Sequence, residues 1–166
     1  MKKRIGIIGG SGSIGSQIVK YYGRKNVTVY SSKKNNYKSF DLTKKIGTDY
    51  LLKIFKNIDI IIFCSSLIKD EKDQKLYHFN YILFSKFLKF LQNTRIKLVY
   101  LSTASVYPKN TKLVCRENKR ITKKNMTGGY YAYTKYLAEK EIKKKIKKNN
   151  YLILRLGAIY GLKKNN

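Results

Sequence analysis

The sequence predicts an α/β domain with a doubly wound parallel sheet, in which helices cover both faces to give three layers. Short apolar runs alternate with helix-length segments along the 166 residues. The runs are nearly continuous, as is typical of parallel strands buried on both faces. A glycine-rich turn joins the first run to the first helix-length segment. With this length and 43% hydrophobic residues, the chain is expected to form one domain, 1–166, with its own core.

Five runs rich in Ile, Val, Leu and Tyr are predicted as strands, and a weaker sixth lies at 39–42. The five strands are expected at 4–8, 27–30, 58–64, 97–102 and 151–156. Helices are expected between them, at 13–22, 43–56, 72–93 and 130–148. The segment 31–38 is short and polar, so one crossover between strands is expected to be abbreviated.

The turn after the first strand has the spacing G-x-x-G-x-x-G, formed by Gly9, Gly12 and Gly15. Glycines allow a tight turn and a close approach of the backbone to a pyrophosphate. The next helix begins at Ser13 and Ile14, and its N-terminus adds partial positive charge. The turn therefore predicts a phosphate-binding site.

Tyr131 and Lys135 lie four residues apart at the start of the last long helix, which puts both side chains on one helix face. A nearby ammonium group can turn a phenol into a usable acid or base. The spacing alone proves nothing, because it recurs at Tyr21/Lys25, Tyr30/Lys34, Tyr136/Lys140 and Tyr160/Lys164. Position separates the pair from the others: it alone follows the long loop 104–129, where a parallel sheet presents its active site.

With these motifs in order, the chain resembles the extended short-chain dehydrogenase/reductase superfamily over nearly its whole length. Members are NAD(P)-dependent nucleotide-sugar epimerases, dehydratases and reductases with a Rossmann-like fold. The matching positions are Gly9, Gly12, Gly15, Asp41, Leu42, the run 59–66, Asn80, the run 101–108, Tyr131, Lys135, the run 154–156, Tyr160 and Gly161.

The resemblance implies roles for the matching residues. Tyr131 would be the general acid/base at a sugar hydroxyl or keto oxygen. Lys135 would lower the pKa of Tyr131 and hold the nicotinamide ribose. Thr103 would bond the same substrate oxygen, with Ser102 and Ser105 as alternatives. The implied cofactor-binding residues are Gly9, Gly12, Ser13, Ile14, Gly15, Ser31, Lys33, Asp41, Leu42, Cys64, Ser65, Ser66, Asn80 and Lys135.

The residues after the second strand favour NADP over NAD. An NAD enzyme of this kind usually has a carboxylate there to bond the ribose hydroxyls. This chain has Ser31 and Lys33 in that region, and hydroxyl and ammonium groups accept a 2′-phosphate that a carboxylate would repel.

The function implied is hydride transfer on a nucleotide sugar, in the cytoplasm, for the synthesis of surface polysaccharide. Two alternatives stay open: a non-catalytic dinucleotide-binding domain or fragment, and a basic adaptor for nucleic acid. The net charge of +28 suggests the adaptor, but the 37 basic residues include only six Arg, and Lys is poor at base readout. Non-specific binding to polyanions is expected in either case.

Members of the superfamily typically continue for as long again, so the usual C-terminal lobe that grips the substrate is expected to be lacking. The chain would then be a fragment, a truncated product, or a domain completed by another chain. The segment 72–93 is apolar on more than one face, which predicts a homodimer through 72–93 and 130–148, a complementing chain, or a covering loop.

Other features exclude further classes of protein. No apolar run reaches the roughly 20 residues of a membrane span. Cys64 and Cys115 form no disulfide framework, and His78 has no metal-ligand company, so no metal site is expected.

Overall fold

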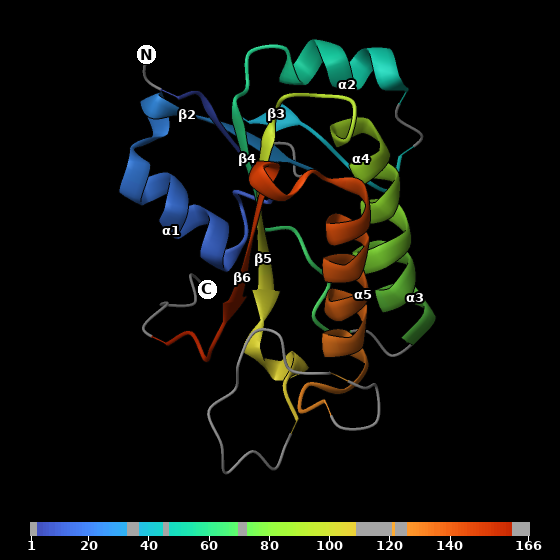
Figure 1. Ribbon diagram of the computed structural model, residues 1–166. Coiled ribbons are helices and arrows are strands. Elements are labelled where there is room, and N and C mark those ends of the chain that lie inside the picture. Colours follow the sequence, from blue (N-terminus) through green and yellow to red (C-terminus); the bar gives the residue numbers. More distant parts are fainter. Residues whose placement is uncertain are drawn as a thin grey trace.

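The computed structural model describes residues 3–32, 37–44, 47–69, 73–108, 121 and 126–160. Within them, six parallel strands form one sheet in the order β3-β2-β1-β4-β5-β6 (Figure 1). The order reverses between β1 and β4, which places a crevice at their carboxyl ends. The strands are β1 Ile5–Ile8, β2 Val27–Ser31, β3 Lys38–Ser39, β4 Ile60–Phe63, β5 Lys97–Thr103 and β6 Tyr151–Leu156.

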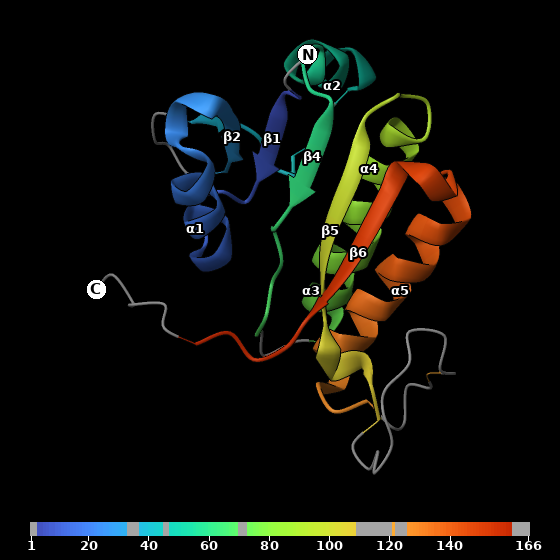
Figure 2. The same cartoon turned by 60° about the vertical axis from the view of Figure 1, so that its left-hand side comes forward.

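Helix α1 lies on one side of the sheet, and α3, α4 and α5 lie on the other (Figure 2). The described helices are α1 Ser13–Tyr22, α2 Thr48–Phe55, α3 Asp73–Tyr77, α4 Phe84–Leu91 and α5 Gly129–Lys145, with short turns η1 Arg24–Asn26, η3 Ala104–Val106 and η5 Lys148–Asn150. A π-helical segment, η2 His78–Leu83, joins α3 to α4. The three-layer, doubly wound parallel fold predicted from the sequence is confirmed.

Two predicted elements are shorter in the structure. Strand β3 spans two residues, and α2 begins at Thr48 rather than at 43. A local turn replaces the expected helix start, since the Asp41 carboxylate accepts bonds from the Thr43 N–H (2.9 Å) and hydroxyl (2.7 Å). Aspartate favours such turns because its side chain competes with the helical bonding pattern.

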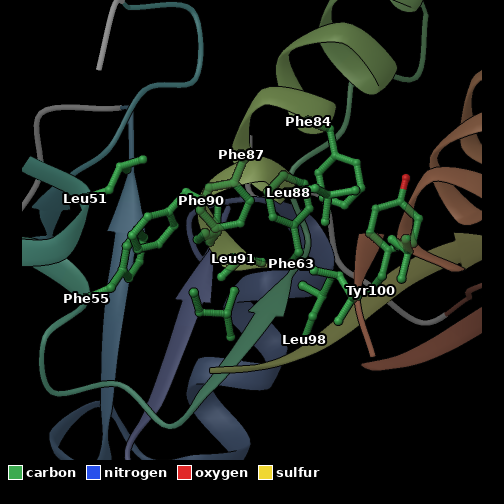
Figure 3. Close-up of a cluster of buried hydrophobic side chains, with 14 of the residues drawn as sticks. Leu51, Phe55, Phe63, Phe84, Phe87, Leu88, Phe90, Leu91, Leu98 and Tyr100 are labelled. Carbon is green, nitrogen blue, oxygen red and sulfur yellow. The ribbon is translucent and has the colours of Figure 1, made fainter. Parts of the chain in front are cut away.

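An aromatic core lies between the sheet and α4 (Figure 3). Phe63 of β4 contacts Phe84 edge-to-face with ring centroids 4.7 Å apart, and Phe84 packs against Tyr100 of β5 at the same distance. Ala138 and Ile142 of α5 belong to this cluster too. The predicted second apolar face of 72–93 is thus packed, at least in part, against α5 of the same chain.

The face of the sheet that carries α1 is covered unevenly. Helix α1 contacts β1 and β2. On β6, Leu152 is 52% exposed and Leu154 is 37% exposed. Arg155, between Leu154 and Leu156, points to α5, so the alternation of a strand puts the two leucines on the α1 side. None of the described helices has the length and apolarity needed to cross a bilayer.

Candidate active site

The glycine turn brings β1, α1 and the loop after β4 into close contact. Gly9 has φ +80°, and its N–H donates to the Tyr30 carbonyl at 3.0 Å. A Cβ on Gly9 would lie 2.7 Å from the Ser65 nitrogen, and a Cβ on Gly15 would lie 2.2 Å from the Gly9 oxygen. These two positions therefore require glycine for the fold itself.

Gly12 differs from the other two glycines of the motif. A Cβ on Gly12 would meet the Gly9 oxygen at 3.3 Å, with no other contact within 4 Å. Gly12 is the N-cap of α1, with φ −78°, and no side-chain hydrogen bond caps the helix there. Gly12 and Ser13 are exposed, and the first turn contains no acidic residue. The helix end thus presents its first N–H groups outward, which suits a diphosphate.

A cavity of about 180 Å³ lies beside this turn. Eight of the predicted cofactor-binding residues line it: Gly9, Gly12, Ser31, Asp41, Leu42, Cys64, Ser65 and Ser66. The sequence interpretation missed Ile8, Ser11, Ser32, Phe40 and Phe79. Each of these five is adjacent in sequence to a predicted residue, so their position next to the predicted residues could have identified them. The hydroxyl oxygens of Ser11 and Ser31 lie 2.8 Å apart, which ties β2 to the glycine turn.

The remaining cofactor-binding predictions have other positions. Ser13, Ile14 and Gly15 form the first turn of α1 next to the cavity. Lys33 lies outside the described residues. Asn80 and Lys135 do not line the cavity and are both buried, 5% and 2% exposed.

Asn80 bonds to the loop that lines the cavity. Its Oδ1 accepts from the Leu67 N–H at 2.8 Å and from the Ser66 hydroxyl at 3.1 Å. Its Nδ2 donates to the Leu67 carbonyl at 2.8 Å and to Thr134 Oγ1 at 3.3 Å. Asn80 therefore holds the loop that lines the cavity and does not itself line the cavity.

Lys135 of α5 is a desolvated cation. Its Nζ lies 4.2 Å from the centroid of the Tyr100 ring. Burial lowers the pKa of Lys135 to about 7, although the charge of Glu139 opposes this change. Burial also raises the pKa of the Cys64 thiol to about 12, so this cavity-lining group is neutral at pH 7.

Tyr131 is half-buried one helical turn before Lys135. Burial raises the pKa of Tyr131, and a side-chain hydrogen bond with Ser66 opposes that rise. Burial thus sets the net direction of the Tyr131 pKa, and a lysine whose own pKa is about 7 is only partly charged at neutral pH. The role of Lys135 in lowering the pKa of Tyr131 stays a prediction.

Thr103 ends β5 and is half-buried. Its Oγ1 accepts a hydrogen bond from the Ser105 N–H at 3.2 Å, which caps the short turn η3. Ser102, the alternative to Thr103, is 4% exposed and its hydroxyl donates to Glu139 Oε1 at 2.5 Å. Of these two hydroxyl groups, Thr103 is thus the more accessible.

Glu139, one helical turn after Lys135, forms a buried ion pair with Arg155. The sequence alone gave this pair no role. Glu139, 1% exposed, accepts from Arg155 Nη2 at 2.6 Å and from Arg155 Nε at 3.0 Å. Arg155 Nη1 also donates to the Tyr107 hydroxyl at 2.9 Å. Two features of the sequence could have indicated this pair: Glu139 follows Lys135 by four residues, and Arg155 lies inside an apolar strand. The described residues contain no group of three His, Cys, Asp or Glu side chains placed to bind a metal.

The parallel sheet, the glycine turn at the reversal of strand order and the open N-terminus of α1 define a Rossmann-type dinucleotide-binding domain. The particular family follows from comparison with known proteins. The model of the NAD dependent epimerase/dehydratase family matches residues 5–166, and the chain belongs to this family.

Solved structures share the fold. The chain is similar to dTDP-4-dehydrorhamnose reductase from Bacillus anthracis in complex with NADP, with 26% identity and a TM-score of 0.77 over 100% of this chain and 57% of that one. It is similar to UDP-N-acetylglucosamine 4-epimerase from Bacillus cereus, with 21% identity and a TM-score of 0.78 over 99% and 59%. It is also similar to UDP-glucuronic acid 4-epimerase from Bacillus cereus in complex with NAD, with 19% identity and a TM-score of 0.73 over 95% and 57%.

The chain thus spans somewhat more than half the length of these proteins. No protein of curated function matches it.

Proposed function

We propose that this chain binds a nicotinamide dinucleotide, NADP(H) in preference to NAD(H), for hydride transfer on a nucleotide sugar with Tyr131 as the acid/base. One observation carries the proposal: the loop that lines the cavity beside the glycine turn is bonded through Asn80 to Thr134, whose hydroxyl donates to the Tyr131 carbonyl. The cofactor cavity and the first turn of α5, which carries Tyr131, are therefore joined by hydrogen bonds. The proposal is also supported by family membership and by the NADP bound to the Bacillus anthracis reductase.

The residues fit the cofactor. Gly12 leaves space against the end of α1 for a diphosphate, because it carries no side chain there. Asp41 and Leu42 line the cavity near β3, where an adenine ring would contact them. Ser31 and Ser32 place uncharged hydroxyls at the end of β2. These hydroxyls can bond the 2′-phosphate of NADP, which a carboxylate at the same place would repel. The bound nicotinamide would supply the acceptor or donor of hydride.

The chain's own groups would handle the proton. The Tyr131 hydroxyl gives a proton to a substrate oxygen, or takes one from it, at Oη. Lys135, one turn away, supplies positive charge that stabilises the phenolate whenever the lysine is protonated. Thr103, at the end of the adjacent strand β5, would orient the same substrate oxygen.

The experiment compares Gly12→Ala with Gly47→Ala. Both glycines are N-caps with extended backbone, and a Cβ on Gly47 meets nothing within 4 Å. We expect Gly12→Ala to fold, because the added methyl group would meet only the Gly9 oxygen, at 3.3 Å. The methyl group would lie at the end of α1, where the diphosphate is proposed to bind. By fluorescence titration, we expect Gly12→Ala to weaken NADPH binding at least tenfold and Gly47→Ala to leave it unchanged. Equal NADPH affinity in the two variants, at equal melting temperatures, would contradict the proposed cofactor site.

A second arm of the same experiment tests catalysis. Tyr131→Phe is expected to keep the NADPH affinity and to lower turnover of dTDP-4-keto sugars or UDP-hexoses at least about 100-fold. Unchanged turnover would favour the non-catalytic alternative. The homodimer or complementing chain, the cytoplasmic location and the role in surface polysaccharide stay predictions.

A further inference from the structure

A second cavity, the α2–α4 cavity, has a volume of about 310 Å³. It is lined by residues of α2, η2 and α4 and of the segment between β3 and α2. Phe40 and Leu42 line both this cavity and the cofactor cavity beside the glycine turn. Its volume lies in the range of small-molecule sites, and the proposed function gives it no role.

The floor of the α2–α4 cavity is apolar. Phe40, Leu51, Leu83 and Phe87 line it, and all four are buried. The rings of Phe40 and Phe87 contact each other edge-to-face, with centroids 5.8 Å apart. Among the described residues that line the cavity, every polar side chain is exposed, so the floor offers no hydrogen-bonding group. The buried part of a ligand must therefore be hydrocarbon.

The rim of the α2–α4 cavity is basic. Lys44, before α2, and Lys86, on α4, are both exposed, and exposed His78 of η2 adds a possible N–H donor. Within the described part of the chain, no acidic side chain lines the cavity, and neither lysine forms an ion pair. Asp41, close to Lys44 in sequence, bonds its carboxylate to the N–H and hydroxyl of Thr43. The rim thus favours an anionic group.

The π-helical segment η2 borders both cavities. His78 and Leu83 of η2 line the α2–α4 cavity, and Phe79 lines the cofactor cavity. π-Helical segments are rare, and they occur frequently at functional sites. Here one such segment contributes both to the rim and to the floor of the α2–α4 cavity.

A third cavity shows what the basic rim adds. Its volume is about 300 Å³, and it lies against α1. It is lined by Ile14, Gln17, Ile18, Tyr21, Tyr22 and Ile159. None of these described residues is charged. Apolar space of this size therefore occurs twice, and the basic rim distinguishes the α2–α4 cavity from the third cavity.

We propose that the α2–α4 cavity binds a fatty carboxylate, with the hydrocarbon chain on the apolar floor and the carboxylate at Lys44 and Lys86. Burial of each CH₂ group stabilises the complex, and the two ammonium groups attract the carboxylate, to which His78 can also donate. A cationic compound with the same hydrocarbon chain would be repelled at the rim. The inference goes beyond the proposed function and involves no NADP(H).

The test titrates the full chain with decanoate by calorimetry, without NADPH and below the concentration at which decanoate forms micelles. We expect saturable binding by the unsubstituted protein. Octanoate should bind more weakly, by about fourfold for each CH₂ group removed. Decylammonium, which has the same hydrocarbon chain and the opposite charge, should not bind measurably. The inference is overturned if decanoate does not bind saturably, if octanoate binds equally well, or if decylammonium binds as tightly as decanoate.

The position of the charges is tested separately, because the net charge of +28 attracts any anion. Lys44→Gln/Lys86→Gln should weaken decanoate binding about tenfold. Lys53→Gln/Lys89→Gln is the matched control: it removes one exposed charge from α2 and one from α4, and neither lysine lines the cavity. At physiological ionic strength it should keep the affinity within about twofold. All four lysines are exposed, so both variants should fold, and an equal loss of affinity in the two overturns the inference.

Ser31→Asp distinguishes the α2–α4 cavity from the cofactor cavity. Ser31 lines the cofactor cavity and not the α2–α4 cavity, so the new carboxylate would repel decanoate from the cofactor cavity alone. The affinity for decanoate should stay unchanged. A loss as large as that in Lys44→Gln/Lys86→Gln would place decanoate in the cofactor cavity and overturn the inference. Failure of the chain to bind NADPH, in contrast, bears on the proposed function only.

Discussion

Burial lowers the pKa of Lys135, and the nearby charge of Glu139 raises it. In the folded chain its pKa is about 7, against an ordinary value of 10.5. Between these values the unfolded chain binds one more proton than the folded chain at this site. The free energy of unfolding therefore rises with pH in this window through Lys135, by on the order of 1 kcal/mol per pH unit.

Lys135→Met removes this proton linkage. Between about pH 7 and pH 9.5, the melting temperature of the unsubstituted chain should rise relative to that of Lys135→Met. The range stops there because buried tyrosines such as Tyr30, whose pKa is raised to about 12, favour the unfolded chain at higher pH. Calorimetry at several pH values provides the measurement. Parallel curves for the two proteins would show that Lys135 is not desolvated.

Ser31 is the residue that tests the choice of cofactor. It is 4% exposed, lines the cavity and contacts the Ser11 hydroxyl. Ser31→Asp places a carboxylate where a 2′-phosphate would bind, so the ratio of NADPH to NADH affinity should fall at least tenfold. Ser39→Asp on β3, which makes the same charge change at an exposed site outside the cavity, should leave the ratio as it is. A ratio that stays constant in Ser31→Asp would remove the preference for NADP.

At the scale of elements, α5 is fixed to the sheet by a buried polar cluster. Ser102 of β5 and Arg155 of β6 are paired in register, and both bond Glu139 of α5. Because Glu139 lies one turn after Lys135, this cluster fixes the position of α5 along its axis relative to the end of β5. Thr103, at that strand end, and the Tyr131–Lys135 turn of α5 are thereby kept at the same end of the sheet.

Glu139→Gln should lower the free energy of unfolding by about 3 kcal/mol, because it leaves the Arg155 charge buried with a neutral partner. Glu141→Gln is the control on the same helix, since Glu141 pairs with Lys145 at 2.7 Å where both side chains are partly exposed. That substitution should lower it by less than about 1 kcal/mol. Urea unfolding measures both. An equal decrease in the free energy of unfolding in the two variants would mean that burial does not make the Glu139–Arg155 pair more important for stability than the Glu141–Lys145 pair.

The elements also show where prediction from sequence stops. The limits of α1 and β6 agree with the predicted 13–22 and 151–156, because an amphipathic pattern and an apolar run define them locally. The single helix predicted at 72–93 instead contains the π-helical η2. Asn80 lies in that segment and bonds to Leu67 and Thr134, which are 13 and 54 residues away. Such distant partners leave no periodic signal in the sequence.

At the scale of the whole molecule, the net charge of +28 predicts non-specific binding to polyanions. The affinity for heparin or single-stranded DNA should fall steeply and linearly with the logarithm of salt concentration. It should be the same in Gly12→Ala, because the charge does not depend on the cofactor site. Binding that persists at high salt, or that discriminates between DNA sequences, would instead favour the nucleic-acid adaptor.

The sequence by itself determined the parallel α/β fold, the glycine turn and the placement of Tyr131 and Lys135 on one helix face, because each depends on local spacing and on the order of elements. The tertiary structure decided which groups surround those side chains. Packing buries Lys135 against Tyr100, bonds Ser66 to Asn80, and pairs Glu139 with Arg155. Those contacts join loops, helices and strands that are far apart in the chain, and the desolvation that changes the pKa of each group exists only once the elements have packed.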